Sequence, residues 1–359
     1  MQGPTMSSDD VILDRVGSAA VIRLNRPKAL NSINLSMVRA IRAALDDAAE
    51  DVSVSCVVLT GEGDRGLCAG GDIRVLFEMG KADDTEATRF WREEFPLNYA
   101  IAHYLKPYVA LMDGITMGGG VGLASHGRHR LVTERTRLAM PETGIGYFPD
   151  VGTSWLLPKA PGEVGTWMGL TGLEVTAADA IFAGLADLSV PSDELPKLVQ
   201  ALGALAADAD DAAVEAVLQS FAVSPGESEL QRNHAVIDRC FAHDNVEDIL
   251  AALDAEGGEF AGRTREAILK RSPTSLKLTL RLLRAGRDSS GLVECLEREF
   301  AAGVEILRHH DFYEGVRAAI IDKDRDPKWS PASLQEVGRE AIELYFAGRH
   351  GTLFPDHRL

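Results

Sequence analysis

The sequence predicts an α/β fold, with a layered core of strands and helices followed by a mostly helical C-terminal region. Continuous apolar runs that end in glycine are typical of strands buried on both faces, and one such run covers residues 54–61. Segments with helical spacing alternate with these runs as far as about residue 190. After about residue 205 the strand-like runs vanish. We therefore expect a core over residues 10–205 and a helical region over residues 206–359.

The elements of the core can be justified in chain order. Residues 11–27 (VILDRVGSAAVIRLNRP) contain two β-branched runs around a Gly-Ser turn, which predicts a hairpin. Residues 36–50 place apolar side chains at helical spacing, from Met37 to Ala48. Further buried strands are predicted over residues 54–61, 107–114 and 130–134.

The C-terminal region is predicted to be a succession of helices. Their ranges are residues 211–221, 228–242, 246–253 and 260–270. A longer helix should follow, with Ser272 as its N-cap, Pro273 in its first turn and Gly286 as its stop signal. We expect this region either to cover a site in the core or to mediate self-association in a homo-oligomer.

Composition and charge exclude several kinds of partner. The chain of 359 residues is 45% apolar, which is enough for a sizeable core. Its net charge of -17 argues against nucleic acid or an anionic membrane surface as a partner. An anionic ligand must therefore be held by local donors.

The cysteines and the N-terminus predict a cytoplasmic location. Cys56, Cys68, Cys240 and Cys295 have no metal-binding spacing and are interpreted as reduced thiols. No run approaches the roughly 20 apolar residues of a membrane span. The N-terminal residues MQGPTMSSDD lack both a signal-peptide core and the arginine-rich character of a transit peptide. The histidines show no metal-ligand spacing, so neither a metal nor a redox cofactor is indicated.

Two glycine-rich stretches follow predicted strands. They are GLCAGGDI (residues 66–73) and GITMGGGVGLASHG (residues 114–127), and a helix is expected to start near Gly120. Glycines there allow the backbone to approach a ligand, and the free amides at a helix start favour an oxygen that carries negative charge. A tight turn with close helix–sheet packing explains one such stretch equally well. Neither stretch is a phosphate-loop or dinucleotide fingerprint.

Together these stretches resemble a known family. NRPKALNSIN, CAGGDI, GITMGGGVGLASHG and MPETGIGYFPDVG are similar to motifs of the crotonase (enoyl-CoA hydratase/isomerase) superfamily, and more narrowly of its 3-hydroxyisobutyryl-CoA hydrolase branch. The resemblance covers residues 11–200 and continues in SPTSLKLTLR and HDFYEGVRAAIIDKDRDPKW. It implies a spiral of ββα units with an acyl-CoA site, and coenzyme A as part of the substrate rather than a separate cofactor.

The resemblance also implies which residues form the site. The amides of Gly71 and Gly119 would form an oxyanion hole, and Arg26 and Lys28 would lie along the phosphates and adenine of coenzyme A. Ordinary surface cations are an equally good explanation of Arg26 and Lys28. Hydratases of the superfamily use two glutamates, whereas this chain has Gly122 at the first position and Glu142 at the second.

Asp150 and Glu94 distinguish the hydrolase branch. The branch has an aspartate in FPDVG, although a turn or helix cap would also explain Asp150 from local spacing. Phe90, Glu94, Leu97 and Ile101 share one face of a predicted helix, so Glu94 interrupts an apolar face, which is costly unless the acid is paired or functional. The alternative is an edge position paired with a surface arginine. Pro96 is expected to kink or end this helix.

These residues predict a thioesterase acting on a small branched 3-hydroxyacyl-CoA. The resemblance points to conversion of 3-hydroxyisobutyryl-CoA to 3-hydroxyisobutyrate and CoA in valine catabolism. Glu142 would attack the thioester or activate water, while Asp150 and Glu94 would hold the water and the substrate hydroxyl and assist proton transfer. One alternative is an enoyl-CoA hydratase or isomerase reaction with Glu142 as sole base. Another is a non-catalytic acyl-CoA-binding protein.

Overall fold

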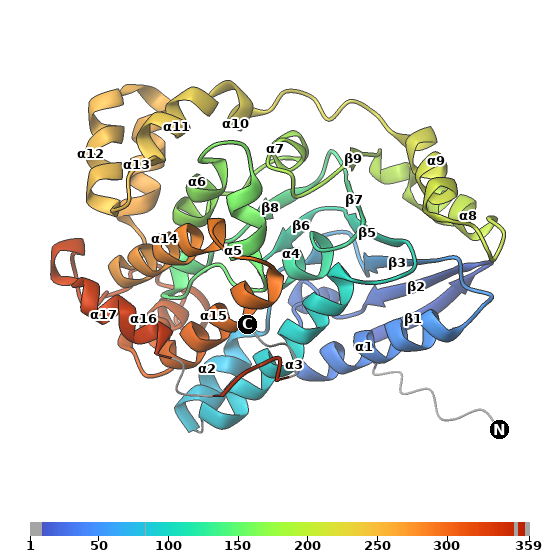
Figure 1. Ribbon diagram of the computed structural model, residues 1–359, viewed down its shortest axis with the longest axis horizontal. Coiled ribbons are helices and arrows are strands. Elements are labelled where there is room, and N and C mark those ends of the chain that lie inside the picture. Colours follow the sequence, from blue (N-terminus) through green and yellow to red (C-terminus); the bar gives the residue numbers. More distant parts are fainter. Residues whose placement is uncertain (1–8, 83, 348–350, 356–359) are drawn as a thin grey trace.

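The computed structural model describes residues 9–82, 84–347 and 351–355, and they form two sheets wrapped by helices (Figure 1). The first sheet has the strand order β1-β2-β3-β5-β7-β9, and the second has the order β4-β6-β8. The strands are β1 (Val11–Val16), β2 (Ala19–Leu24), β3 (Cys56–Gly61), β4 (Gly66–Cys68), β5 (Tyr108–Met112), β6 (Ile115–Met117), β7 (His129–Val132), β8 (Arg137–Ala139) and β9 (Leu188–Ser189).

The chain winds through the two sheets as a spiral. Only β1 and β2 are antiparallel, and every later pairing between strands is parallel. Each turn of the spiral adds one strand to the first sheet and one to the second, as β3 then β4, β5 then β6, and β7 then β8. Helices connect successive turns, so the predicted spiral of ββα units is confirmed.

The helices of the spiral cover its outer faces. The predicted helix over residues 36–50 is confirmed as α1, whose N-cap Asn34 accepts a hydrogen bond from the Met37 amide and whose apolar face packs on the sheet. The α-helices as far as residue 203 are α1 (Leu35–Glu50), α2 (Ile73–Ala82), α3 (Asp84–Ala102), α4 (Gly119–Ala124), α5 (Thr153–Leu156), α6 (Val164–Thr171), α7 (Ala177–Phe182) and α8 (Leu195–Gly203). Short 3-10 helices are η1 (Pro27–Ala29), η2 (Glu142–Ile145), η3 (Leu157–Lys159) and η4 (Ser192–Glu194).

After α8, the part of the chain that the structure describes forms helices and loops and no further strand. The helices are α9 (Asp211–Phe221), α10 (Glu229–Arg232), α11 (His234–Phe241), α12 (Val246–Glu256), α13 (Gly258–Leu269), α14 (Pro273–Arg287), α15 (Leu292–Ile306), α16 (His310–Val316) and α17 (Arg339–Glu343), with the π-helix η5 (Arg317–Ile321) and the 3-10 helices η6 (Leu334–Glu336) and η7 (Leu344–Phe346). The helix predicted over residues 228–242 is divided at Asn233, whose backbone leaves the helical conformation.

Helix α14 begins as predicted but does not end as predicted. Ser272 caps it through a hydrogen bond from the Ser275 amide, and Pro273 lies in its first turn. Gly286 is wrong as a stop signal, because it lies inside the helix, which ends at Arg287. The glycine is required for packing instead, since a Cβ there would lie 1.8 Å from the Ser154 carbonyl oxygen.

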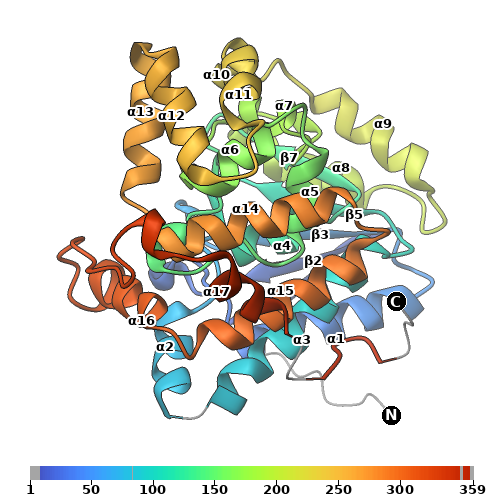
Figure 2. The same cartoon turned by 60° about the vertical axis from the view of Figure 1, so that its left-hand side comes forward.

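The C-terminal helices share a hydrophobic core with the spiral. Helix α14 contacts α5 and α6, and helix α15 contacts α3 and α5; Figure 2 shows both orange helices lying across the spiral. One buried cluster contains residues of the spiral such as Phe95 together with Leu282 and Phe300 from these helices. The division of the chain near residue 205 stays a prediction. Among the described residues, no helix combines the length and the apolar character needed to span a bilayer.

Candidate active site

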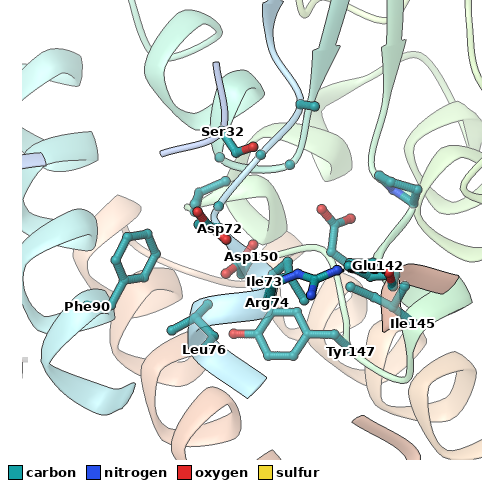
Figure 3. A pocket seen from close by; sticks show the side chains of 18 of the residues that line it. Ser32, Asp72, Ile73, Arg74, Leu76, Phe90, Glu142, Ile145, Tyr147 and Asp150 are labelled. Atoms are coloured by element: carbon teal, nitrogen blue, oxygen red, sulfur yellow. Dashed lines mark hydrogen bonds between the residues drawn. The ribbon is translucent and has the colours of Figure 1, made fainter. Parts of the chain in front are cut away.

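A cavity of about 370 Å³ opens between the spiral and the C-terminal helices (Figure 3). Its walls come from the β4–α2 junction, the start of α4, η2 with the turn that follows it, and the buried face of α3. The C-terminal region adds Phe312 from α16 and Ile320 from η5. This region therefore covers one side of the cavity, while its role in self-association stays a prediction.

The two predicted glycine amides lie side by side in this cavity. A Cβ built on Gly119 would lie 3.4 Å from the Gly71 nitrogen, and both residues line the cavity. Neither amide donates a hydrogen bond to any other part of residues 9–82, 84–347 and 351–355. Gly118 precedes Gly119 and has a φ of 49°, and a Cβ on it would lie 2.7 Å from the Glu142 Oε1 atom. Glycine is thus required for Glu142 to approach the backbone.

Glu142 begins the short helix η2, directly after β8 and Pro141. Its side chain is buried, and its Oε2 atom has no hydrogen-bond partner among the described residues. Burial raises the pKa of the Glu142 carboxyl well above its usual range, and the charge of Asp150 raises it further. Glu142 is therefore a buried acid that faces an open cavity rather than a salt-bridge partner.

Asp150 lies in the turn between η2 and α5 and faces the same cavity. Its neighbours Val151 and Gly152 both adopt left-handed backbone conformations, with φ of 53° and 80°. Burial raises the pKa of the Asp150 carboxyl, the charge of Glu299 on α15 adds to this increase, and the Tyr147 hydroxyl opposes it. The alternative of a simple helix cap does not fit, because the side chain of Asp150 lines the cavity instead of capping α5.

Glu94 is buried on the inner face of α3, as the helical spacing predicts. It is 2% exposed, and its Oε1 atom has no hydrogen-bond partner in the described part of the chain. The alternative for Glu94, an edge position paired with a surface arginine, describes its neighbour Glu93 instead. Glu93 forms ion pairs with Arg39 at 2.6 Å and with Arg89 at 3.5 Å. Burial raises the pKa of the Glu94 carboxyl, and Asp150 raises it further. Helix α3 continues through Pro96, so the helix does not end there, and a kink at Pro96 stays a prediction.

The resemblance assigns Gly122 to the position of the first hydratase glutamate, and the space for a side chain there is occupied. A Cβ at this position would lie 2.6 Å from the Val151 Cβ atom and 3.0 Å from the Asn98 Nδ2 atom. Such distances are shorter than van der Waals contact. The turn that carries Asp150 therefore fills the place of the missing acid.

Arg26 and Lys28 lie outside the residues that line the cavity. The Arg26 guanidinium donates hydrogen bonds to the Ser32 carbonyl oxygen at 2.6 Å and to Asp72 at 2.9 Å, so it connects the loop after η1 to the β4–α2 junction. Lys28 is exposed on η1. Their predicted contact with coenzyme A stays a prediction.

Two cavity residues were missed by the sequence analysis. Arg74 lines the cavity and donates a hydrogen bond to the Ile320 carbonyl oxygen at 3.2 Å; a cation directly after the GGDI motif was the available signal. Tyr147 also lines the cavity, and its buried hydroxyl has no hydrogen-bond partner of good geometry among the described residues.

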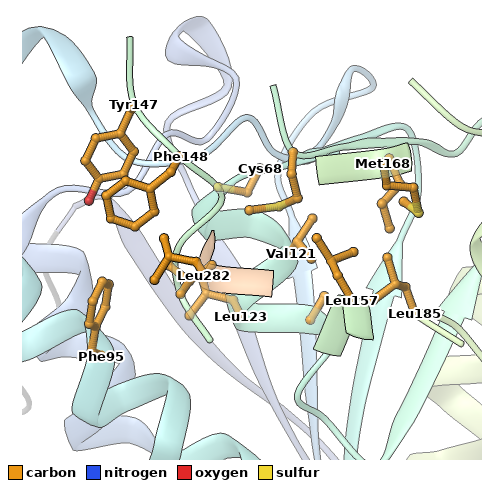
Figure 4. Packing of buried hydrophobic residues seen from close by; sticks show 14 of the residues in the cluster. Cys68, Phe95, Val121, Leu123, Tyr147, Phe148, Leu157, Met168, Leu185 and Leu282 are labelled. Carbon is orange, nitrogen blue, oxygen red and sulfur yellow. The ribbon is translucent and has the colours of Figure 1, made fainter. Parts of the chain in front are cut away.

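Aromatic rings support the floor of the cavity. The Tyr147 ring stacks on Trp91 at 5.8 Å between centroids and on Phe148 at 4.4 Å. Behind them, Phe148 and Phe95 belong to the hydrophobic core that includes Leu282 of α14 (Figure 4). This side of the cavity is therefore aromatic and continuous with the hydrophobic core.

Comparisons with known proteins agree with this geometry. Residues 19–346 match the enoyl-CoA hydratase/isomerase family. The chain is 42% identical to "3-hydroxyisobutyryl-CoA hydrolase, mitochondrial" of Gallus gallus over 95% of this chain and 90% of that protein, and 45% identical to the protein of the same name from Rattus norvegicus over 94% and 88%. A solved structure titled as a carnitinyl-CoA dehydratase from Mycobacterium thermoresistibile has a TM-score of 0.91 at 42% identity, covering 96% of this chain and 98% of that one.

A second solved structure, titled as an enoyl-CoA hydratase from Rhodobacter sphaeroides 2.4.1, has a TM-score of 0.87 at 41% identity, covering 95% of this chain and 98% of that one. The relatives are named as mitochondrial proteins, which contradicts the predicted cytoplasmic location. The four cysteines are indeed buried and free, but reduced thiols argue only against an oxidising compartment. The chain belongs to the enoyl-CoA hydratase/isomerase (crotonase) family, in its 3-hydroxyisobutyryl-CoA hydrolase branch.

Proposed function

We propose that this protein hydrolyses the thioester of 3-hydroxyisobutyryl-CoA, releasing 3-hydroxyisobutyrate and CoA, a step of valine breakdown. Relatives that carry the hydrolase name are 42–45% identical over most of the chain, so the prediction of an acyl-CoA thioester hydrolase is confirmed. One observation carries the mechanism: the buried carboxyls of Glu142 and Asp150 line one cavity with two free glycine amides.

The amides of Gly71 and Gly119 bind the thioester carbonyl oxygen in this mechanism. Negative charge develops on that oxygen as the carbonyl carbon becomes tetrahedral, and fixed donors in a site without water stabilise it. Loss of one such donor typically reduces the rate by about 100- to 1000-fold. The free amides support this role because they have no competing acceptor within the described residues.

Glu142 is the nucleophile or base, and it reacts in its ionised form. Burial and the charge of Asp150 both raise the pKa of its carboxyl, so the population of the reactive form grows as the pH rises. In direct attack, a Glu142 oxygen bonds to the carbonyl carbon, the carbon–sulfur bond breaks, and water then hydrolyses the mixed anhydride. In the other route, Glu142 removes a proton from the attacking water.

Asp150 supplies the proton for the leaving thiolate. Burial and neighbouring charge raise its pKa, which favours the protonated form that donates to the thiolate, and it recovers a proton when water is consumed. Glu94, whose pKa is also raised and whose side chain lines the cavity, binds the 3-hydroxyl group of the acyl chain in this mechanism. Arg26, Lys28 and Arg74 supply local positive charge for the phosphates of coenzyme A.

The competing function is a hydratase or isomerase reaction, which the titles of the two similar solved structures favour. The geometry at Gly122 argues against two-acid hydration, because Val151 and Asn98 occupy the space of a side chain there. A reaction with Glu142 as sole base would consume an enoyl-CoA without releasing thiol.

Thiol release separates these functions. We expect wild type to release free CoA from 3-hydroxyisobutyryl-CoA, and Glu142→Ala and Asp150→Ala to lose nearly all of this activity. Glu305→Gln, which alters a buried glutamate of α15 outside the cavity, is the control. No release by wild type, or equal release by all variants, contradicts the proposal. Borohydride reduction during turnover, followed by mass spectrometry of the peptide with Glu142, tests for the anhydride.

A further inference from the structure

Glu299 is a buried acid of α15 that the mechanism above does not use. It is fully buried, and its carboxylate accepts three hydrogen bonds from the segment directly after Asp150. The donors are the Gly152 amide at 2.6 Å, the Ser154 amide at 2.9 Å and the Ser154 hydroxyl at 2.5 Å. An acid 145 residues away in sequence thus binds the turn that carries a site residue.

That turn has a conformation that needs support. Val151 is β-branched and has a φ of 53°, a region such residues rarely adopt, and Gly152 follows with a φ of 80°. Strained backbone of this kind persists only where the surroundings hold it. Gly152 has no side chain with which to cap α5, so the carboxylate of Glu299 binds the free amides at the start of that helix.

His126 holds the same turn from the opposite side. Its Nε2 atom lies 2.7 Å from the Val151 carbonyl oxygen, and because a carbonyl only accepts, Nε2 carries the proton. Burial lowers the pKa of His126 to about 4, so the ring is neutral at physiological pH. The peptide between Val151 and Gly152 is therefore fixed on its carbonyl side by His126 and on its amide side by Glu299.

We propose that Glu299 is a positioning residue of the hydrolase, which holds the strained Asp150 turn so that the Asp150 carboxyl faces the thioester. This inference rests on the proposed function and deepens it. It adds a C-terminal helix to the catalytic apparatus, although that helix lies outside the motifs that carry the family resemblance.

The charge of Glu299 acts on Asp150 in addition to its hydrogen bonds. The titratable groups that face Glu299 are Asp150 and Tyr147 across the site, and Cys295 and Arg298 on its own helix. Burial raises the pKa of Glu299 to about 7, against the opposing effect of its three donors. When ionised, Glu299 favours the protonated form of Asp150, the form that donates to the leaving thiolate.

A double-mutant cycle separates a role of Glu299 that acts through Asp150 from a role in the stability of the fold alone. Glu299→Gln keeps the size of the side chain, removes its charge, and places an NH2 group against the turn amides. We expect kcat to fall by roughly 10- to 100-fold with KM changed by less than about 3-fold, as for loss of an interaction made in the transition state. In an Asp150→Asn background the same change should have almost no further effect.

The pH profile gives a second readout. Without the charge of Glu299, Asp150 loses its proton at lower pH, so the alkaline limb of kcat/KM should move to lower pH in Glu299→Gln. Glu305→Gln, which removes a charge from a buried glutamate on the same helix without touching the turn, should leave both the limb and kcat unchanged. If Glu299→Gln is poorly folded by circular dichroism, Ser154→Ala removes only one of the three hydrogen bonds.

The failures are distinguishable. An inactive wild type overturns the proposed function. Suppose that wild type is active and Asp150→Asn is impaired. If Glu299→Gln is then as active as wild type, only the proposed role of Glu299 is overturned. The same holds if the losses caused by Glu299→Gln and Asp150→Asn simply multiply, because independent effects show that Glu299 does not act through Asp150.

Discussion

The two turns that carry the site acids are held in different ways. The Glu142 turn is held by backbone groups: the Gly144 amide donates to the Pro141 carbonyl, the Tyr147 amide to the Glu142 carbonyl, and the distant Ser272 amide to the Thr143 carbonyl. The Asp150 turn has one such local bond, from the Thr153 amide to the Asp150 carbonyl, and is held in addition by side chains from distant elements, His126 and Glu299. Buried side chains are therefore part of the support of the second turn, and nearby sequence, which does not contain them, favours a plain turn at Asp150.

The largest loss is expected at Glu142. Glu142→Gln removes the nucleophile or base while keeping its volume, so we expect kcat to fall by on the order of 10⁴-fold, as for core members of other catalytic units. Steady-state thiol release measures the loss. A fall of less than tenfold with unchanged substrate would place the reacting acid elsewhere.

Asp150→Asn should cost less, because it removes proton transfer but leaves the attacking group. We expect a loss of about 100- to 1000-fold in kcat, in the range of general acid catalysis. A substrate with a more acidic thiol leaving group should recover part of the loss, since it needs less protonation. Equal recovery in Glu142→Gln would contradict the division of roles between the two acids.

The glycines of the two turns should differ in their tolerance of alanine. A Cβ at Gly152 would lie 2.7 Å from both the His126 Nε2 atom and the Leu292 Cδ1 atom, and its φ of 80° disfavours any side chain. A Cβ at Gly144 meets only the end of the Arg271 side chain at 2.6 Å. We expect Gly152→Ala to lower the free energy of unfolding by about 1–3 kcal/mol and Gly144→Ala to have a much smaller effect. Thermal melting measures both; equal effects would remove the contrast between the turns.

The raised pKa of Glu142 predicts a pH dependence of stability. Because the folded-state pKa lies above the ordinary value of 4.5, protonation favours the folded state. The stabilising contribution is present below about pH 4.5 and is lost as the pH rises through the raised pKa, by up to about 1.4 kcal/mol per pH unit. Glu142→Gln should therefore melt at a higher temperature than wild type at pH 8, with the difference shrinking on acidification. If the stability of wild type changes between pH 5 and pH 8 by the same amount as that of Glu142→Gln, the raised pKa of Glu142 is contradicted.

Lys28 should give the smallest effect. It is exposed and outside the cavity lining, so Lys28→Ala should raise KM by about 2- to 5-fold without changing kcat, and added salt should remove the difference. Initial rates at low and high ionic strength measure it. A salt-independent change would show that Lys28 acts on the fold rather than on the phosphates of coenzyme A.

Periodicity and motif resemblance predicted much of the fold and part of the site. The hairpin, the buried strands and the acid on the inner face of α3 follow from local spacing, because each depends on which side chains share one face. Gly286 was wrongly predicted to end α14, because its close contact with Ser154 joins segments that are far apart in the sequence. Glu299 did leave a signal, since it shares the buried face of α15 with Cys295, Ala302 and Ile306, as Glu94 does on α3.

The concentration of acids around the cavity has a consequence for the product. Hydrolysis converts an uncharged thioester carbonyl into a carboxylate, and this new anion forms among Glu142, Asp150 and Glu94 on a chain of net charge -17. Like charges at short range repel, and the surrounding field extends that repulsion to the mouth of the cavity. Repulsion by these acids thus weakens binding of the product carboxylate, which favours its release from the site.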